Sequence, residues 1–149
     1  MNQNPADSGI PLDSFSSETA LVQEFIDDGS GPVPRDYRLY VFGGRVEFVI
    51  VDWKQCDEDR SSFFNLSWER MNVSNGFPEI VGDIARPKHF DEMVAAAETL
   101  ARDIEFVRVD FFDTDAKLYF AELTSTPNCG LRPFQPAEFD RYLGELWKL

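Results

Sequence analysis

Two runs of strand-forming residues stand on either side of Gly43-Gly44, and they limit the possible folds more than any other feature. The first run is DYRLYVF (36–42) and the second is RVEFVIVDW (45–53). β-Branched and aromatic residues favour strands, and a Gly-Gly link favours a tight turn between antiparallel strands. We therefore expect a β-hairpin over residues 36–53.

Alternation of side chains along these two strands predicts which residues face the core. In the first strand, Tyr37, Leu39 and Val41 lie on one face, and Asp36, Arg38 and Tyr40 lie on the other. In the second strand, the same alternation places Val46, Phe48 and Ile50 on one face. Glu47, Val49 and Val51 then lie on the opposite face.

A second hairpin is expected from FVRVDFF (106–112) and KLYFAELT (117–124), joined by residues 113–116. Folding near residue 115 places Arg108 roughly opposite Glu122. The apolar side chains then share the core face; on the returning strand these are Tyr119, Ala121 and Leu123. The polar side chains share the other face, and they are Arg108, Asp110, Glu122 and Thr124.

The rest of the chain supplies a short strand and two helices. LVQEFI (21–26) is expected to form a strand, and residues 54–62 are expected to form a polar loop. Apolar residues at helical spacing predict a helix over 90–102, and a last helix is expected from about Pro136. The predicted order, β-ββ-α-ββ-α, indicates an α+β fold: an antiparallel sheet with helices on one face.

Composition limits the function classes. The 149 residues suit one domain, and the formal net charge of −13 disfavours an electrostatic interaction with nucleic acid. No run approaches the roughly 20 apolar residues of a membrane span. Residues 1–19 are rich in polar residues and Pro, lack a signal-peptide core and are expected to form a flexible leader. Together with only two cysteines, these features predict a cytoplasmic protein.

The polar face of the second hairpin suggests a chemical role. Two carboxylates, Asp110 and Glu122, beside the guanidinium of Arg108 suit a site for Mg²⁺ and phosphate, because Mg²⁺ takes one or two carboxylates together with phosphate oxygens. The alternative is a solvated polar face, which any half-exposed antiparallel sheet shows. On alternation alone, the solvated face is the more common case.

The residues that follow Glu122 favour the chemical interpretation. Arg108-Val109-Asp110 on one strand, followed by Glu122-Leu123-Thr124 and the loop 125–130, resembles the C-terminal signature of ATP-grasp enzymes. The signature has Arg-x-Asp, then Glu-x-Asn and a Pro-Gly loop. D-alanine–D-alanine ligase is a familiar member of these enzymes.

A more specific resemblance is to the TupA-like ATP-grasp family of bacterial polysaccharide biosynthesis, in which Thr commonly replaces the Asn of Glu-x-Asn. The similarity runs in order from about residue 21 to the C-terminus. The matching segments are DYRLYVFGG (36–44), VDW (51–53), Trp68, Gly76-Phe77-Pro78, Asp91-Glu92-Met93, FVRVDFF (106–112) and YFAELTSTPNCG (119–130).

The resemblance implies a role for each matching residue. Asp110, Glu122 and Thr124 are implied metal ligands for Mg²⁺, and Arg108 is implied to act on the transferred phosphate. The implied ATP contacts are the backbone of Glu24, Phe25 and Ile26 at adenine, Asp36 at ribose and Arg38 at phosphate. The implied substrate-binding residues are Asn128, Cys129 and Gly130.

The resemblance thus implies an ATP- and Mg²⁺-dependent carboxylate–amine ligase acting in cell-surface polysaccharide biosynthesis through an acyl phosphate. Its partners are ATP and a small carboxylate or amine, including a saccharide-linked one; an amino acid and a uronic acid are both candidates for the carboxylate. Residues 20–149 correspond to the C-terminal lobe of the fold, and no segment matches the N-terminal lobe with its phosphate-binding lysine and glycine-rich lid. The alternative function is therefore a truncated, non-catalytic nucleotide-binding or protein-interaction module.

Overall fold

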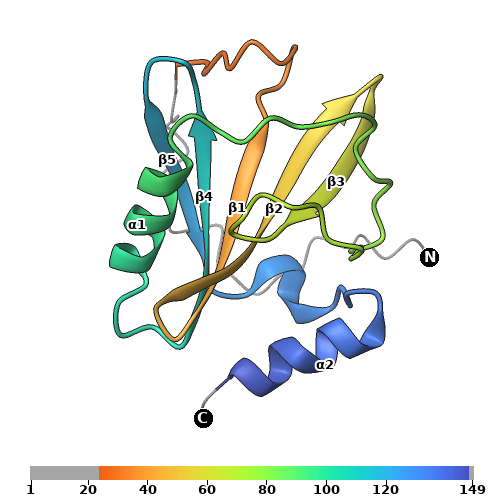
Figure 1. Cartoon of the computed structure of the whole chain (residues 1–149), viewed down its shortest axis with the longest axis vertical. Coiled ribbons are helices and arrows are strands. Elements are labelled where there is room, and N and C mark those ends of the chain that lie inside the picture. Colours follow the sequence, from red (N-terminus) through yellow and green to blue (C-terminus); the bar gives the residue numbers. More distant parts are fainter. Residues whose placement is uncertain (1–23, 148–149) are drawn as a thin grey trace, which may run out of the picture.

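The computed structural model describes residues 24–147, so the predicted leader 1–19 and the start of the predicted strand 21–26 lie outside the described residues. The fold is mixed α+β, with a five-stranded antiparallel sheet in the order β3-β2-β1-β4-β5 (Figure 1). The strands are β1 (Asp36–Phe42), β2 (Arg45–Gln55), β3 (Glu58–Phe64), β4 (Phe106–Asp113) and β5 (Leu118–Thr124). The helices are α1 (Phe90–Leu100) and α2 (Ala137–Leu146), and a short helical turn, η2, covers Pro127–Gly130.

The predicted β1–β2 hairpin is confirmed, but one face assignment is wrong. Gly43 and Gly44 both have positive φ (53° and 77°), which this tight turn requires and glycine adopts without steric cost. A bulge lies between the Tyr40–Phe48 and Val41–Val46 pairs and leaves Glu47 without a partner. Val46 therefore joins the face of Val49 and Val51 rather than that of Phe48 and Ile50.

The predicted polar loop over residues 54–62 is also wrong, because most of it forms a hairpin. Strand β2 continues to Gln55, Cys56 and Asp57 make the turn with positive φ, and β3 begins at Glu58. Strand β3 lies at an edge of the sheet, where charged side chains are common since they face water and discourage further pairing. Its polar sequence therefore concealed a strand.

The predicted strand over 21–26 is not found in its described part, since Glu24, Phe25 and Ile26 form no regular element. The predicted helix over 90–102 ends at Leu100, and the last helix begins at Ala137, one residue after the expected Pro136.

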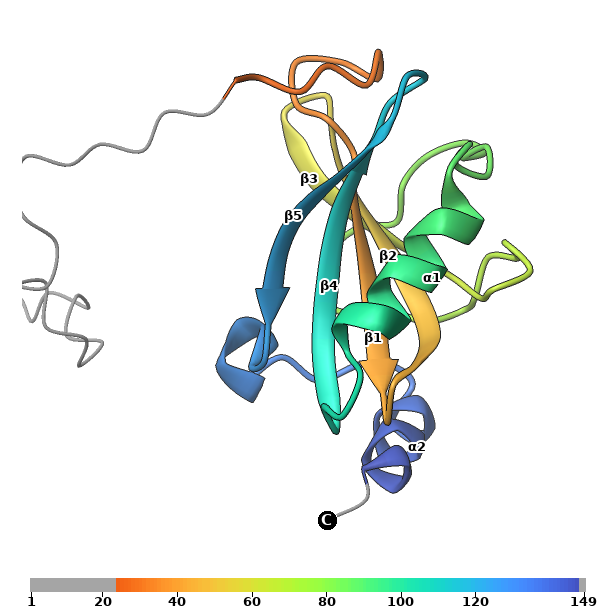
Figure 2. The same cartoon turned by 90° about the vertical axis from the view of Figure 1, so that its left-hand side faces the viewer.

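The two helices pack on opposite faces of the sheet, which corrects the prediction that both cover one face. Met93 and Ala97 of α1 pack with Leu39 and Val109 in one apolar cluster. Leu143 of α2 belongs to a second cluster, on the other face, with Tyr40, Phe42, Phe48, Ile50, Phe63 and Phe106. Figure 2 shows α1 on one side of the sheet and the helical turn after β5 on the other. The chain stays on that other side after β5, so α2 reaches the face that α1 leaves open.

Candidate functional site

Strands β4 and β5 bring the four predicted polar residues onto one face. Asp110 pairs directly with Glu122, and Arg108 pairs with Thr124. The expectation that Arg108 lies opposite Glu122 is therefore wrong by two residues along β5, although the shared face is confirmed. The turn shifts the pairing by one residue, and a bulge that leaves Ala121 of β5 without a partner shifts it by one more.

The same bulge changes the face assignments toward the other end of β5. Phe120, not Tyr119, lies opposite Phe111, and the two rings meet edge to face with centroids 6.1 Å apart. Leu123 pairs with Val109 but is exposed because β5 is an edge strand. The expected core packing of Tyr119, Ala121 and Leu123 is therefore incomplete.

Arg108 is the centre of a hydrogen-bonded cluster on this face. Its Nε donates to Oδ1 of Asp110 at 2.8 Å, and its Nη2 donates to Oδ2 of Asp110 at 2.6 Å. The same Nη2 donates to Oε1 of Glu122 at 2.6 Å and to the hydroxyl of Thr124 at 3.1 Å. Oδ2 of Asp110 and Oε1 of Glu122 thus both lie 2.6 Å from the same guanidinium nitrogen, which holds the two carboxylates close to each other.

A second group of charges lies beside the first on β1 and β2. Arg38 forms ion pairs with Asp36 at 2.8 Å and with Asp52 at 2.6 Å, and its Nε lies 3.8 Å from Asp110. Across both groups, four carboxylates face two guanidinium groups, which leaves a formal balance of −2. This negative excess favours a divalent cation.

Burial sets the protonation of the carboxylates. Desolvation raises the pKa of Asp110 to about 7, against the hydrogen bond from Arg108 and with a further increase from nearby Asp36. Desolvation also raises the pKa of Asp36. The hydrogen bond from Thr124 lowers the pKa of Glu122, whose side chain is 59% exposed. The paired carboxylates of β4 and β5 therefore differ in charge near neutral pH.

The cluster fits a Mg²⁺ ion in charge and ligand type but not in its present arrangement. Both oxygens of Asp110 accept hydrogen bonds from Arg108, so a shared ion requires this guanidinium to move away. Among residues 24–147, no group of three or more acidic, cysteine or histidine side chains is arranged to hold a metal. Two carboxylates are nevertheless enough for Mg²⁺, which keeps several waters or phosphate oxygens.

Asp36 and Trp53 each have a buried polar atom without a hydrogen-bond partner in the described part of the chain. These are Oδ1 of Asp36, an acceptor, and Nε1 of Trp53, a donor. Both residues border one pocket together with Arg38, Asp52 and Lys54. Unpartnered buried polar atoms are rare and costly, and here one acceptor and one donor without partners belong to residues that line the same pocket.

The other predicted residues lie in separate places. Glu24, Phe25 and Ile26 line a pocket with the turn between β4 and β5, and they are not among the residues that contact Arg108. Asn128 borders the pocket at Asp36, and both Asn128 and Gly130 border a further cavity near α2. Cys129 is exposed and lines neither.

The loop after β5 adopts a left-handed backbone at Asn128. Asn128 has φ 50° and ψ 34°, and Cys129 follows with φ 56°. Asparagine tolerates this conformation better than other non-glycine residues do. The backbone at Asn128 is therefore one that asparagine adopts at little cost.

Two residues of this face were not predicted as site residues. Asp52 anchors Arg38, and Tyr40 pairs with Arg108 across β1 and β4. Alternation from Asp36 and Arg38 already placed Tyr40 on the polar face, so that signal was present. The position of Asp52 depends on the bulge in the first hairpin, which the sequence pattern did not reveal.

No helix in the described region is long and apolar enough to cross a membrane. No curated protein and no solved structure matches the chain. A model of the TupA-like ATP-grasp family matches residues 12–148. Because this match covers nearly all of the 149 residues, the chain belongs to the TupA-like ATP-grasp family.

Proposed function

We propose that this chain carries the metal- and phosphate-binding part of an ATP- and Mg²⁺-dependent carboxylate–amine ligase. The observation that carries the proposal is the direct pairing of Asp110 with Glu122, both within 2.6 Å of Nη2 of Arg108. Two carboxylates and a guanidinium meeting at one point provide the charges that phosphoryl transfer requires. Membership of the family supports the same chemistry.

Each residue has a distinct role in this proposal. Asp110 and Glu122 hold Mg²⁺ with help from Thr124, and the ion, when bound, neutralises charge on the phosphates of ATP. Arg108 exchanges its two carboxylate partners for phosphate oxygens, which its planar guanidinium binds in a bidentate manner. Until then the guanidinium occupies the place of the cation, which keeps Asp110 from being buried as an unpaired charge.

The remaining roles concern the nucleotide. The unpartnered Oδ1 of Asp36 is an acceptor for a ribose hydroxyl, and Arg38 lies next to it for a phosphate. The pocket lined by Glu24, Phe25 and Ile26 is assigned to adenine.

The reaction proceeds in two balanced steps. A carboxylate oxygen of the substrate attacks the γ-phosphorus, the bond to the β–γ bridging oxygen breaks, and ADP leaves. The amine nitrogen then attacks the acyl carbon, the carbon–oxygen bond to phosphate breaks, and phosphate departs while the nitrogen loses a proton to solvent. In both steps positioning and electrostatic stabilisation supply most of the acceleration. Because ATP is consumed, we place the reaction in the cytoplasm, with acceptors from cell-surface polysaccharide assembly.

Isothermal titration with Mg²⁺·ATP tests the metal site. Asp110→Asn is expected to weaken binding by about 100-fold, which is about 2.7 kcal/mol. The matched control is Asp91→Asn, which changes an exposed carboxylate on α1, on the opposite face of the sheet. Equal affinity of Asp110→Asn and wild-type protein would contradict the proposed metal site.

A non-catalytic module is the second candidate, and one observation favours it. Arg108 already satisfies Asp110 and one oxygen of Glu122, so the cluster is self-consistent without any ligand. This candidate predicts that Mg²⁺·ATP binds weakly or not at all and that Asp110→Asn does not change its affinity. ADP release in the presence of a carboxylate and an amine would exclude it.

A further inference from the structure

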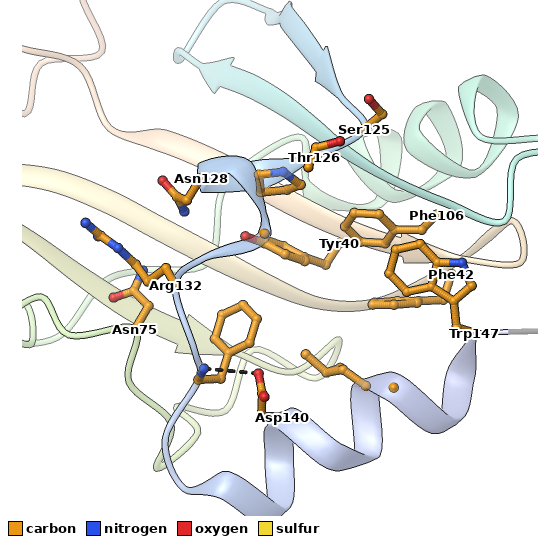
Figure 3. A pocket seen from close by; sticks show the side chains of 15 residues that line it. Tyr40, Phe42, Asn75, Phe106, Ser125, Thr126, Asn128, Arg132, Asp140 and Trp147 are labelled. Atoms are coloured by element: carbon orange, nitrogen blue, oxygen red, sulfur yellow. Dashed lines mark hydrogen bonds between the residues drawn. The ribbon is translucent and has the colours of Figure 1, made fainter. Parts of the chain in front are cut away.

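The face that carries the charged cluster continues directly into an aromatic cavity. Tyr40 follows Arg38 by two residues on β1 and pairs with Arg108 on β4, so it adjoins the cluster. Beyond Tyr40 the side chains on this face are apolar. The walls of the cavity are formed by Tyr40, Phe42, Phe106, Phe134, Leu143 and Trp147 (Figure 3).

The size of the cavity limits what it can hold. Its volume is about 270 Å³, and its lining comes from β1, β4, the segment after β5 and α2. Small-molecule sites usually measure about 300–1,000 Å³, so this cavity suits one ring-sized group rather than a nucleotide. Aromatic walls favour an aromatic or compact aliphatic group through apolar burial and edge-to-face contact.

The end of the cavity nearest the charged cluster is polar. Asn128 and Arg132 border both this cavity and the pocket at Asp36 and Arg38. The guanidinium of Arg132 lies over the ring of Phe77, at 4.3 Å, and no carboxylate in residues 24–147 lies within ion-pair distance of it. Figure 3 shows Arg132, Asn128 and Asn75 at one end and Trp147 with Phe42 at the other. The cavity therefore has a cationic end and an aromatic end.

One acidic residue also lines the cavity. Asp140 of α2 accepts a hydrogen bond from the amide of Phe134 at 3.2 Å, and its side chain faces the interior (Figure 3). Asp140 is exposed, so water and salt weaken its repulsion of a second carboxylate on the ligand. Its charge thus adds a modest preference against side groups that are themselves acidic.

We propose that this cavity selects the carboxylate substrate by binding its single apolar ring, with the carboxylate directed to Arg132 and Asn128 at the border of the charged cluster. The inference rests on the proposed ligase function and specifies its substrate class. It favours an aromatic monocarboxylate, including an aromatic amino acid, over a uronic acid or an acidic amino acid.

Gly144 provides a way to fill the cavity without disturbing the fold. It lies in α2, lines the cavity, and a Cβ built on it meets no atom within 4 Å. Gly144→Phe therefore adds a ring at the wall of the cavity, where open space is available to it. Gly144→Ala is the matched control, because it also replaces the helix-weakening glycine but adds little volume.

The probe is 3-phenylpropionate, titrated into the whole chain by calorimetry and by backbone NMR shifts. Gly144→Phe is expected to weaken its binding at least tenfold, since one misplaced group in an apolar pocket changes affinity about 10–200-fold. Gly144→Ala is expected to bind within about twofold of wild type. Glucuronate is expected to bind at least about tenfold more weakly than 3-phenylpropionate, because a sugar ring leaves hydroxyl groups unpaired among aromatic walls.

The carboxylate contact has its own test. Arg132→Gln is expected to weaken the binding of 3-phenylpropionate but to leave the binding of 3-phenylpropan-1-ol unchanged, since the alcohol has no charge to pair with Arg132. Equal loss for both ligands would show that Arg132 acts only through packing, and would overturn its assigned role.

The outcomes separate this inference from the proposed function. No binding of 3-phenylpropionate, or equal binding to the Gly144→Phe variant, overturns the cavity assignment even where Mg²⁺·ATP binds normally. Binding of 3-phenylpropionate that Gly144→Phe blocks, without any binding of Mg²⁺·ATP, supports the cavity and removes the ligase function.

Discussion

Strands β1 and β4 present Leu39 and Val109 to one face of the sheet, and Arg38, Arg108 and Asp110 to the other. On the first face α1 covers a continuous apolar cluster. On the second face Arg108 and Asp110 are also buried, at 5% and 1% exposed, whereas the Arg38 side chain is 30% exposed. The same two strands are therefore buried in two different ways.

The difference shows which face the fold depends on. Burial of apolar side chains stabilises the folded state roughly in proportion to the area removed from water. A buried ion cluster adds little net stability, because desolvation offsets most of the attraction between its charges. Retaining charges on β4 therefore points to a chemical role, and the apolar face supplies the stability that permits it.

The largest effect is expected from Arg108→Ala. This change leaves Asp110 buried without its cation, and loss of one partner from a buried ion pair costs about 3–5 kcal/mol of unfolding free energy. The loss should be greatest at pH 8 and smaller at pH 5, where Asp110 is neutral. Urea unfolding at both pH values measures this loss of unfolding free energy. A loss that is independent of pH would contradict the unpaired charge of Asp110 as its cause.

Leu39→Ala is expected to lower the unfolding free energy by about 3 kcal/mol, since it opens a cavity among fully buried side chains. In contrast to Arg108→Ala, this loss should be the same at pH 5 and pH 8, because no group that titrates in this range is involved. Urea unfolding of the two variants side by side makes the comparison. A strong pH dependence for Leu39→Ala would show that the two faces are not independent.

The raised pKa of Asp110 also predicts an effect of pH on the stability of the wild-type protein. The folded pKa of about 7 lies above the ordinary aspartate value of 3.8, so the folded state keeps a proton that the unfolded chain has lost between these values. The contribution of Asp110 to the unfolding free energy should therefore fall as pH rises from 4 to 7, by at most about 1.4 kcal/mol per pH unit.

Asp110→Asn isolates this contribution, because the amide resembles the protonated carboxyl and does not titrate. The difference in unfolding free energy between variant and wild type should shift in favour of the variant as pH rises from 5 to 8. Thermal or urea unfolding across this range measures the difference. A shift in favour of the wild type would mean that Arg108 dominates over desolvation.

The smallest effect is expected from Glu122→Gln. The Glu122 side chain is 59% exposed, and exposed ion pairs contribute less than about 1 kcal/mol. The affinity of the Glu122→Gln variant for Mg²⁺·ATP should nevertheless fall, because the amide is a poorer metal ligand than the carboxylate. Urea unfolding measures the change in stability, and calorimetric titration of the same sample measures the change in affinity for Mg²⁺·ATP. A large loss of stability would show that Glu122 has a structural role that its exposure does not suggest.

Local patterns predicted much of the fold. Alternation along residues 106–112 and 117–124, joined by a turn, was enough to place Arg108, Asp110, Glu122 and Thr124 on one face. The face assignments that failed involve an irregularity in a strand. The bulges at Glu47 and Ala121 shift the face of later residues, and alternation alone gives no sign of an inserted residue.

Tertiary context explains the other failures. Strand β3 is charged because it lies at an edge, and its sequence resembles that of a loop. Helix α2 lies on the face opposite α1 because of the path that the chain takes after β5, which helix periodicity does not encode. For the same reason the aromatic cavity near α2 was not foreseen, although each of its aromatic residues was visible in the sequence.

The position of β5 at the edge of the sheet has a consequence for access to the cluster. Asp110 lies on an interior strand with neighbours on both sides, whereas Glu122 and Thr124 lie on a strand hydrogen-bonded on one side only. Edge strands open locally at lower free energy than interior ones. The carboxylate of Glu122 can therefore move away from the cluster when β5 opens locally. Asp110, on an interior strand, stays in place during this opening.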